Sequence, residues 1–156
     1  MNVFRVCRNR HAGTAFSGEG ARLYGARWNP AGVPLVYTSL SLSLAMVELF
    51  VHLDAAEQPD DLVTLNAELP VARKSAERID VSGLPKDWRR VNHPALRKVG
   101  AEWALSARSL TLLVPSAVVD GEWNVLVNPA HPDAKLISIS KPRPLRLDAR
   151  MFRNRG

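Results

Sequence analysis

The chain has 156 residues, of which 46% are hydrophobic and 23% are charged, and its formal net charge is +6 at pH 7. This composition excludes a disordered chain, and the length suffices for a single domain with a sizeable core, which we expect over residues 1–156. No apolar run approaches the ~20 residues that a membrane-spanning helix requires. Cys7 is the only cysteine, which excludes an internal disulfide and a thiolate zinc cluster.

The compartment and the basic excess can also be interpreted from the sequence. The first residues lack the apolar core of a signal peptide, and a lone cysteine fits a reducing compartment, so we expect a cytoplasmic protein. Lysines and arginines are frequent between Lys141 and Arg155. Such a tail could contact nucleic acid or an acidic partner, or it could be a solvated terminus.

The first half of the chain predicts strands around one apolar helix. Val3–Val6 can form a strand, residues 9–25 are predicted to be an irregular loop, and Val33–Tyr37 is a short strand whose proline favours an edge or a first position. Residues 40–53 are apolar on two faces at helical spacing, which predicts a helix buried on both sides and capped by Ser39 or Ser41. Residues 62–69 alternate, as expected of a half-exposed strand.

The second half predicts one more helix and several short strands. Asn92 or His93 can cap a helix that has Pro94 in its first turn and continues to about Arg108. Short strands are predicted over residues 110–114, 123–127, 136–139 and 145–147. Because strands and helices do not alternate strictly, the sequence predicts an α+β domain with a mixed sheet flanked by helices.

Glu48 is the most informative residue, because it is the one carboxylate of the apolar helix. Burying an unpaired carboxylate costs several kcal/mol, so the group needs a partner, a function or both. It could bind substrate or stabilise developing positive charge. It could equally form a structural ion pair with an arginine, or with His52 one turn further on.

Four further residues are candidates for a site. Arg27 lies in a Gly/Asn/Pro loop and could hold a phosphate, or it could be a surface arginine. Arg5 lies in an apolar strand and needs an anionic partner, either Glu48 or a ligand phosphate. Tyr37 could stack on a flat heterocycle or belong to the core, and Ser116 could reach a pocket or be a turn serine. The four histidines have no metal-ligand spacing, so no metal is expected.

Several blocks in a fixed order resemble one family. The blocks are Ser-Gly-Glu-Gly-Ala-Arg (17–22), Gly-Ala-Arg-Trp-Asn-Pro-Ala-Gly (25–32), Val-Tyr-Thr-Ser (36–39), Ala-Met-Val-Glu-Leu-Phe-Val-His-Leu (45–53), Val-Pro-Ser-Ala-Val (114–118) and Asn-Val-Leu-Val-Asn-Pro-Ala-His-Pro (124–132). This order resembles the RES domain, a family of toxins from bacterial toxin–antitoxin pairs. One departure is Ala26, where the family usually has a second glycine.

The resemblance implies a largely antiparallel α+β fold similar to ADP-ribosyltransferases and an enzyme that cleaves NAD at the nicotinamide–ribose bond. NAD is then the substrate, and no cofactor is expected. Glu48 would stabilise the ribose cation, Arg27 and Arg5 would hold the two phosphates, and Tyr37 would flank the nicotinamide. Ser116 would contact the ribose region or position Glu48. Asn29 would be a weaker candidate for a ligand contact.

The resemblance also implies partners and alternatives. The expected partner is an Xre-type helix-turn-helix antitoxin that blocks the active site and makes any DNA contact, with a homodimer of the toxin in the complex and no membrane contact. The ADP-ribose could pass to water, to phosphate or to a specific protein, and the last of these is the alternative function. A remote alternative is a non-enzymatic basic domain that binds nucleic acid.

Overall fold

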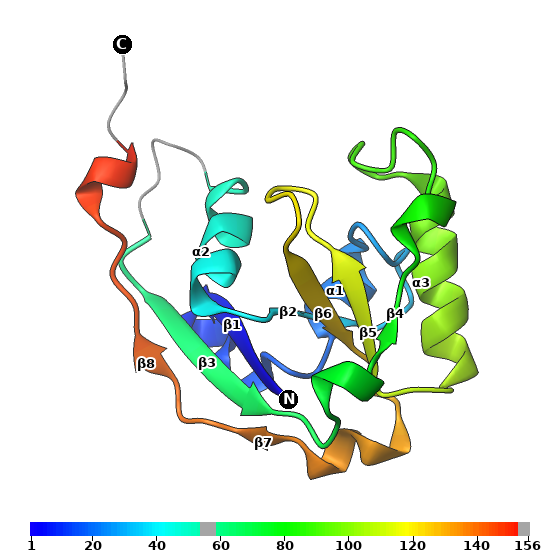
Figure 1. Cartoon of the computed structure of the whole chain (residues 1–156). Coiled ribbons are helices and arrows are strands. Elements are labelled where there is room, and N and C mark those ends of the chain that lie inside the picture. The colour runs from blue at the N-terminus through cyan, green and yellow to red at the C-terminus, as the bar shows by residue number, and fades with distance from the viewer. Residues whose placement is uncertain (54–58, 153–156) are drawn as a thin grey trace.

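One mixed sheet organises the chain in the computed structural model, which describes residues 1–53 and 59–152 (Figure 1). Within these residues the sheet has eight strands in the order β4-β5-β6-β2-β1-β3-β7, and β8 pairs with β3 outside this path. Only β4 and β5 are parallel to each other, so the predicted α+β fold with a mixed, largely antiparallel sheet is confirmed. The strands are β1 Asn2–Arg8, β2 Val36–Ser39, β3 Leu62–Glu68, β4 Glu77–Arg78, β5 Thr111–Pro115, β6 Trp123–Val127, β7 Ser138–Ile139 and β8 Arg143–Pro144.

The helices are short. The α-helices are α1 Glu19–Tyr24, α2 Leu42–Phe50 and α3 Pro94–Ser106, and 3-10 turns cover Asn9–Thr14, Arg73–Ser75, Val81–Gly83, Pro132–Leu136 and Ala149–Phe152. Two of these elements occupy residues 9–25, so the prediction of an irregular loop there was wrong. Helix α1 contains a glycine and β-turn residues surround it, which is why periodicity did not reveal it.

Helix α2 is shorter and less buried than predicted. Ser41 caps it, because its side chain accepts a hydrogen bond from the Leu44 amide at 3.1 Å. Of its residues only Leu44 and Ala45 are fully buried, and Val51 just beyond its end is 51% exposed. The prediction of burial on both sides was therefore wrong. The residues of its last turn, Glu48 among them, are half-buried.

Helix α3 follows the prediction closely. The His93 ring accepts a hydrogen bond from the Ala95 amide at 3.2 Å, and Pro94 occupies the first helical turn. Leu96 and Trp103 are fully buried against the sheet residues Leu112 and Leu126. This helix therefore anchors one side of the sheet.

The pairing of the strands decides one alternative and corrects two predictions. β2 lies in the middle of the sheet, between β1 and β6, and Pro34 precedes its first residue, so of the two predicted positions the edge is excluded. Instead of residues 145–147, Arg143–Pro144 pair with β3. The prediction that one face of residues 62–69 is exposed does not hold at Thr64. This residue is buried, because it points to the sheet face on which α2 packs.

Strand register separates the two faces of the sheet. Side chains opposite each other in an antiparallel pair lie on one face, and alternate residues lie on the other. Phe4, Ser39, Asn124 and Leu126 thus share the face covered by α2 and α3. The opposite face is packed against Ala15, Phe16 and Ala134, which lie in or beside two of the 3-10 turns.

Candidate functional site

The candidate site lies on the helical face of the sheet, where α2 meets the strands β2 and β6. Glu48 projects from the last full turn of α2 and is half-buried. Its Oε1 accepts hydrogen bonds from Ser116 Oγ at 2.7 Å and from Asn124 Nδ2 at 2.6 Å. Both partners are neutral, so the carboxylate has lost water on one side without gaining an ion pair among the described residues. The alternative of a structural ion pair, with an arginine or with His52, has no such contact among the described residues.

Ser116 is held by the turn that follows β5. Its Oγ accepts from the amides of Val118 and Val119 at 3.1 and 2.9 Å, while its own hydrogen is given to Glu48. The hydroxyl is thereby oriented by the backbone, and the residue is only 2% exposed. Of the two sequence-based hypotheses for Ser116, the structure supports the positioning of Glu48.

Asn124 and Ser39 are site residues that sequence reasoning missed. They are register partners on β6 and β2, and Ser39 Oγ lies 2.6 Å from Asn124 Oδ1. The alternation of residues 123–127 indicates that Asn124 and Leu126 share a face, but it does not say which strand lies alongside. Only the pairing of β2 with β6 brings Ser39, Asn124 and Glu48 together.

Arg27 lies close enough to interact electrostatically with both Glu48 and Tyr37. Burial lowers the pKa of Arg27 from its ordinary value, and the charges of Glu48 and Tyr37 oppose this. Its Nη1 donates to the carbonyls of Trp88, Arg89 and Arg90 at 3.3, 3.1 and 3.2 Å. Nε and Nη2 have no partner among the described residues and are not enclosed, so two nitrogens remain for an anion.

The loop that carries Arg27 is fixed by α3. Arg97 Nε donates to the Ala26 carbonyl at 3.1 Å, and a Cβ on Gly100 would lie 1.8 Å from the Trp28 carbonyl oxygen. Gly25 supplies the left-handed backbone with φ of 68°, whereas Ala26 is not among the residues with positive φ. The loop therefore does not require a second glycine at position 26.

Tyr37 and Asn29 form an inner layer behind Arg27. The Tyr37 hydroxyl donates to Asn29 Oδ1 at 2.7 Å and accepts from the Trp28 amide at 3.0 Å. Burial raises the pKa of Tyr37 above its ordinary value, so the phenol stays protonated as this donor role requires.

Asn29 is 0% exposed and its Nδ2 lies within hydrogen-bonding distance of the carbonyls of Ala21, Pro30 and Val33. The structure therefore places Asn29 inside the loop as its support, and a ligand contact by Asn29 stays a prediction. Stacking of Tyr37 on a ligand stays a prediction.

Arg5 is not brought to the site. The register that places Phe4 opposite Ser39 puts the neighbouring Arg5 on the other face of the sheet. Its Nη1 donates to the Tyr37 carbonyl at 2.7 Å, Nε is buried without a partner, and burial lowers its pKa. The alternative partner, Glu48, does not contact it. The structure therefore does not bring Arg5 to Glu48 and Arg27, and binding of two phosphates by two arginines stays a prediction.

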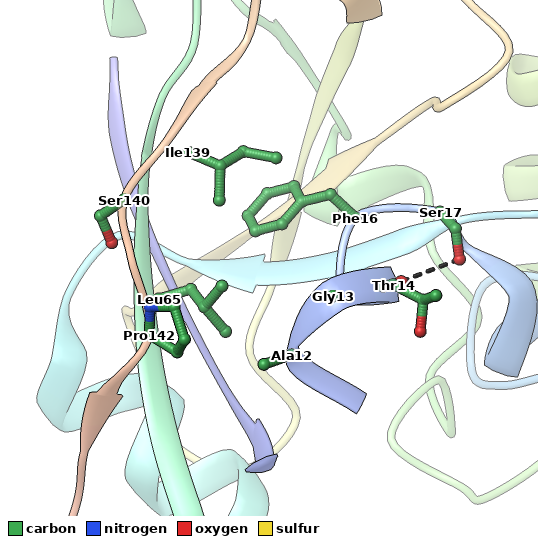
Figure 2. A pocket seen from close by; sticks show the side chains of 9 residues that line it. All are labelled: Ala12, Gly13, Thr14, Phe16, Ser17, Leu65, Ile139, Ser140 and Pro142. Carbon is green, nitrogen blue, oxygen red and sulfur yellow. Dashed lines mark hydrogen bonds between the residues drawn. The ribbon is translucent and has the colours of Figure 1, made fainter. Parts of the chain in front are cut away.

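Two hollows occur on the face away from Glu48. The larger, about 540 Å³, is lined by mainly apolar groups that include Phe16, Leu65 and Ile139 (Figure 2). A second, of about 350 Å³, adjoins it through Phe16 and Ile139 and includes Lys135. Neither contains a carboxylate or an ordered polar network, so we place the candidate site at Glu48. The described residues contain no cluster of metal-ligating side chains and no helix long and apolar enough to cross a membrane.

Known proteins resemble this chain in sequence and in fold. Residues 2–148 match the family model described as RES domain. The chain is 36% identical over 155 residues to "Toxin Res" of Photorhabdus laumondii, covering 98% of each chain. It is 43% identical over 141 residues to "Prs ADP-ribosylating toxin" of Sphingobium sp., covering 88% of this chain and 86% of the relative. A solved structure of the M. tuberculosis MbcT-MbcA toxin–antitoxin complex has a similar fold, with a TM-score of 0.68, 19% identity, and coverage of 97% and 86% of the two chains.

Proposed function

This chain belongs to the RES domain family, and from that premise we propose that it is the toxin of a bacterial toxin–antitoxin pair and acts by consuming NAD. The reaction we propose is cleavage of the bond between nicotinamide and ribose, with water or phosphate as the acceptor. The single observation that carries this proposal is the carboxylate of Glu48, held by neutral donors at a half-open position beside the Arg27 guanidinium.

The proposed chemistry requires a fixed negative charge. Loss of nicotinamide leaves positive charge on the ribose, as in glycoside hydrolysis, and a carboxylate on that side lowers the barrier. Because the groups that donate hydrogen bonds to Glu48 are neutral, its negative charge remains available to the ribose cation. A direct ion pair with a lysine or an arginine would compensate that charge. Glu48 would therefore stabilise the ribose cation and hold a ribose hydroxyl.

Arg27 would bind the pyrophosphate of NAD. Its Nη1 is committed to three backbone carbonyls, which fixes the guanidinium plane, and the remaining nitrogens can donate to phosphate oxygens. Because Arg5 lies on the other sheet face, this proposal assigns phosphate binding to Arg27 alone. Tyr37 supports the Arg27 loop through the Trp28 amide and could still offer its ring edge to the nicotinamide.

The partner in this proposal is an antitoxin that covers the site, of the Xre helix-turn-helix type, with DNA contacted only through it. Support comes from the fold shared with the toxin of the M. tuberculosis complex. Many arginines of this chain are occupied by nearby carboxylates, including the pairs Arg22–Glu19, Arg108–Glu77 and Arg150–Asp148. This pairing disfavours the remote alternative of a non-enzymatic nucleic-acid-binding domain.

The test is release of nicotinamide from NAD by purified chain freed of antitoxin, measured with and without phosphate. Glu48→Ala is the negative control. Release by the wild type that Glu48→Ala lacks supports the proposal, and a rate that requires phosphate identifies a phosphorolytic acceptor. Equal activity of wild type and Glu48→Ala would contradict the role of Glu48.

A second candidate function is transfer of ADP-ribose to a specific protein. It is favoured by the 43% identity to a relative named as an ADP-ribosylating toxin of Prs. Both reactions use the same carboxylate and differ in the acceptor that reaches the ribose. Incubation of labelled NAD with a cell lysate followed by gel electrophoresis separates them: a discrete labelled band indicates transfer, and free ADP-ribose or its phosphate indicates cleavage.

A further inference from the structure

We infer that Asn124, oriented by Ser39, is a positioning residue that turns Glu48 so that only its Oε2 oxygen faces the substrate. The inference rests on the proposed function. It begins from an asymmetry: both hydrogen bonds to the carboxylate, from Ser116 and from Asn124, end on Oε1. Oε2 accepts none from the described residues and is not among the atoms enclosed away from solvent.

The orientation of the Asn124 amide is determined by its two neighbours. The reversed amide would place Oδ1 2.6 Å from the ionised Glu48, where two acceptors repel each other. In the observed orientation Nδ2 donates to Glu48, and the Ser39 hydroxyl donates to Oδ1 at 2.6 Å. Ser39 is 4% exposed, so this hydrogen bond is shielded from solvent. A relay thus runs from Ser39 through Asn124 to Glu48.

The relay joins three elements that are distant in sequence. Ser39 ends β2, Asn124 lies at the start of β6, and Glu48 lies on α2, so the sheet register sets the carboxylate angle. Fixing Oε1 from the protein side restricts rotation of the carboxylate. Oε2 is then ready to accept a ribose hydroxyl and to face the developing cation without reorganisation.

The test combines kinetics with a measurement on Glu48 itself. Nicotinamide release is measured for wild type, Asn124→Ala, Asn124→Asp, Ser39→Ala and the double variant Asn124→Ala/Ser39→Ala. Thr38→Val is the matched control, because Thr38 lies on the same strand but faces away and donates to the Val125 carbonyl. In parallel, ¹³C NMR follows titration of the Glu48 side-chain carboxyl in each protein.

Each variant has a distinct expected result. Asn124→Ala lowers kcat roughly tenfold to a hundredfold with little change in KM, since a charge-assisted hydrogen bond is lost at the reacting carboxylate. Asn124→Asp moves the acid limb of the pH–activity profile and the NMR midpoint upward, because two carboxylates then share the site. Ser39→Ala lowers kcat in the wild-type background but has no further effect in Asn124→Ala, because it acts through Asn124.

The outcomes separate this inference from the proposed function. An unchanged pH profile and NMR midpoint in Asn124→Asp, or additive effects of the two alanine substitutions, would overturn the inference even if wild type consumes NAD. If wild type consumes no NAD, the proposed function fails, while the NMR midpoints still decide whether Asn124 controls the Glu48 carboxylate. A loss of activity in Thr38→Val as large as in Asn124→Ala would assign the effect to general strand disruption and would also overturn the inference.

Discussion

Replacing Glu48 with glutamine separates its charge from its shape. Glutamine has almost the same volume, and its side-chain oxygen can still accept from Ser116 and Asn124 at the Oε1 position. We therefore expect the free energy of unfolding to change by no more than about 1 kcal/mol. The negative charge that glutamine lacks would attract the ribose cation at contact distance. At about 4 Å and an effective dielectric constant near 20, this attraction amounts to about 4 kcal/mol. The expected loss in kcat is thus about a hundredfold to a thousandfold.

The assay is kcat for nicotinamide release, together with urea unfolding of the same preparations. Glu102→Gln is the matched control, because Glu102 lies on α3 in an exposed pair with Lys98 at 3.9 Å and should leave both quantities unchanged. Retention of more than a tenth of wild-type kcat by Glu48→Gln would refute the electrostatic role of the carboxylate. Loss of activity together with a large loss of stability would indicate a structural role instead.

Three further substitutions test the surroundings of Glu48. Gly100→Ala should destabilise the fold by about 1–3 kcal/mol or more and lower NAD consumption, because its Cβ would lie 1.8 Å from the Trp28 carbonyl oxygen. Gly20→Ala is the control in urea unfolding, because a Cβ at Gly20 meets open space, and it should be as stable as wild type. Tyr37→Phe should cost about 1–3 kcal/mol, because the Trp28 amide and the Asn29 Oδ1 atom lose the hydrogen bonds that they make with the Tyr37 hydroxyl. Because burial raises the folded-state pKa of Tyr37, the contribution of its hydroxyl to stability is complete below about pH 10 and falls at higher pH, where the phenol ionises in the unfolded chain. The difference between the urea midpoints of wild type and Tyr37→Phe should therefore be smaller at pH 10.5 than at pH 8. Arg27→Ala should raise KM for NAD about tenfold or more with a smaller change in kcat, and an unchanged KM with lost turnover would assign Arg27 to the chemical step.

Local sequence signals located most of the elements correctly. Residues 123–127 form the predicted strand, and the helix that follows His93 begins at Pro94, where the capping residues indicate. These signals succeed because they depend on neighbouring residues alone. The same signals failed for residues 9–25, where two short helices lack a complete apolar face. For Val33–Tyr37 they located the strand approximately, but the proline did not decide between an edge and a first position.

Residue chemistry identified part of the site. A carboxylate in an apolar helix, an arginine in a glycine loop and a serine after a strand were recognisable as candidates, and the structure brings Glu48, Arg27 and Ser116 to one region. Arg5 had an equally suggestive context but lies on the opposite face. Asn29 had the chemistry of a ligand contact, yet its amide holds the loop from inside.

The sequence by itself determined which side chains are available and which short segments become helix or strand, because these properties follow from residue type and local periodicity. The tertiary structure decided which of those side chains meet. The β2–β6 register places Ser39 against Asn124, and the position of α2 on that face brings Glu48 to both. Strand order and register depend on contacts between residues far apart in the sequence, such as Ser39 and Asn124, which are 85 positions apart, and no local pattern specifies them.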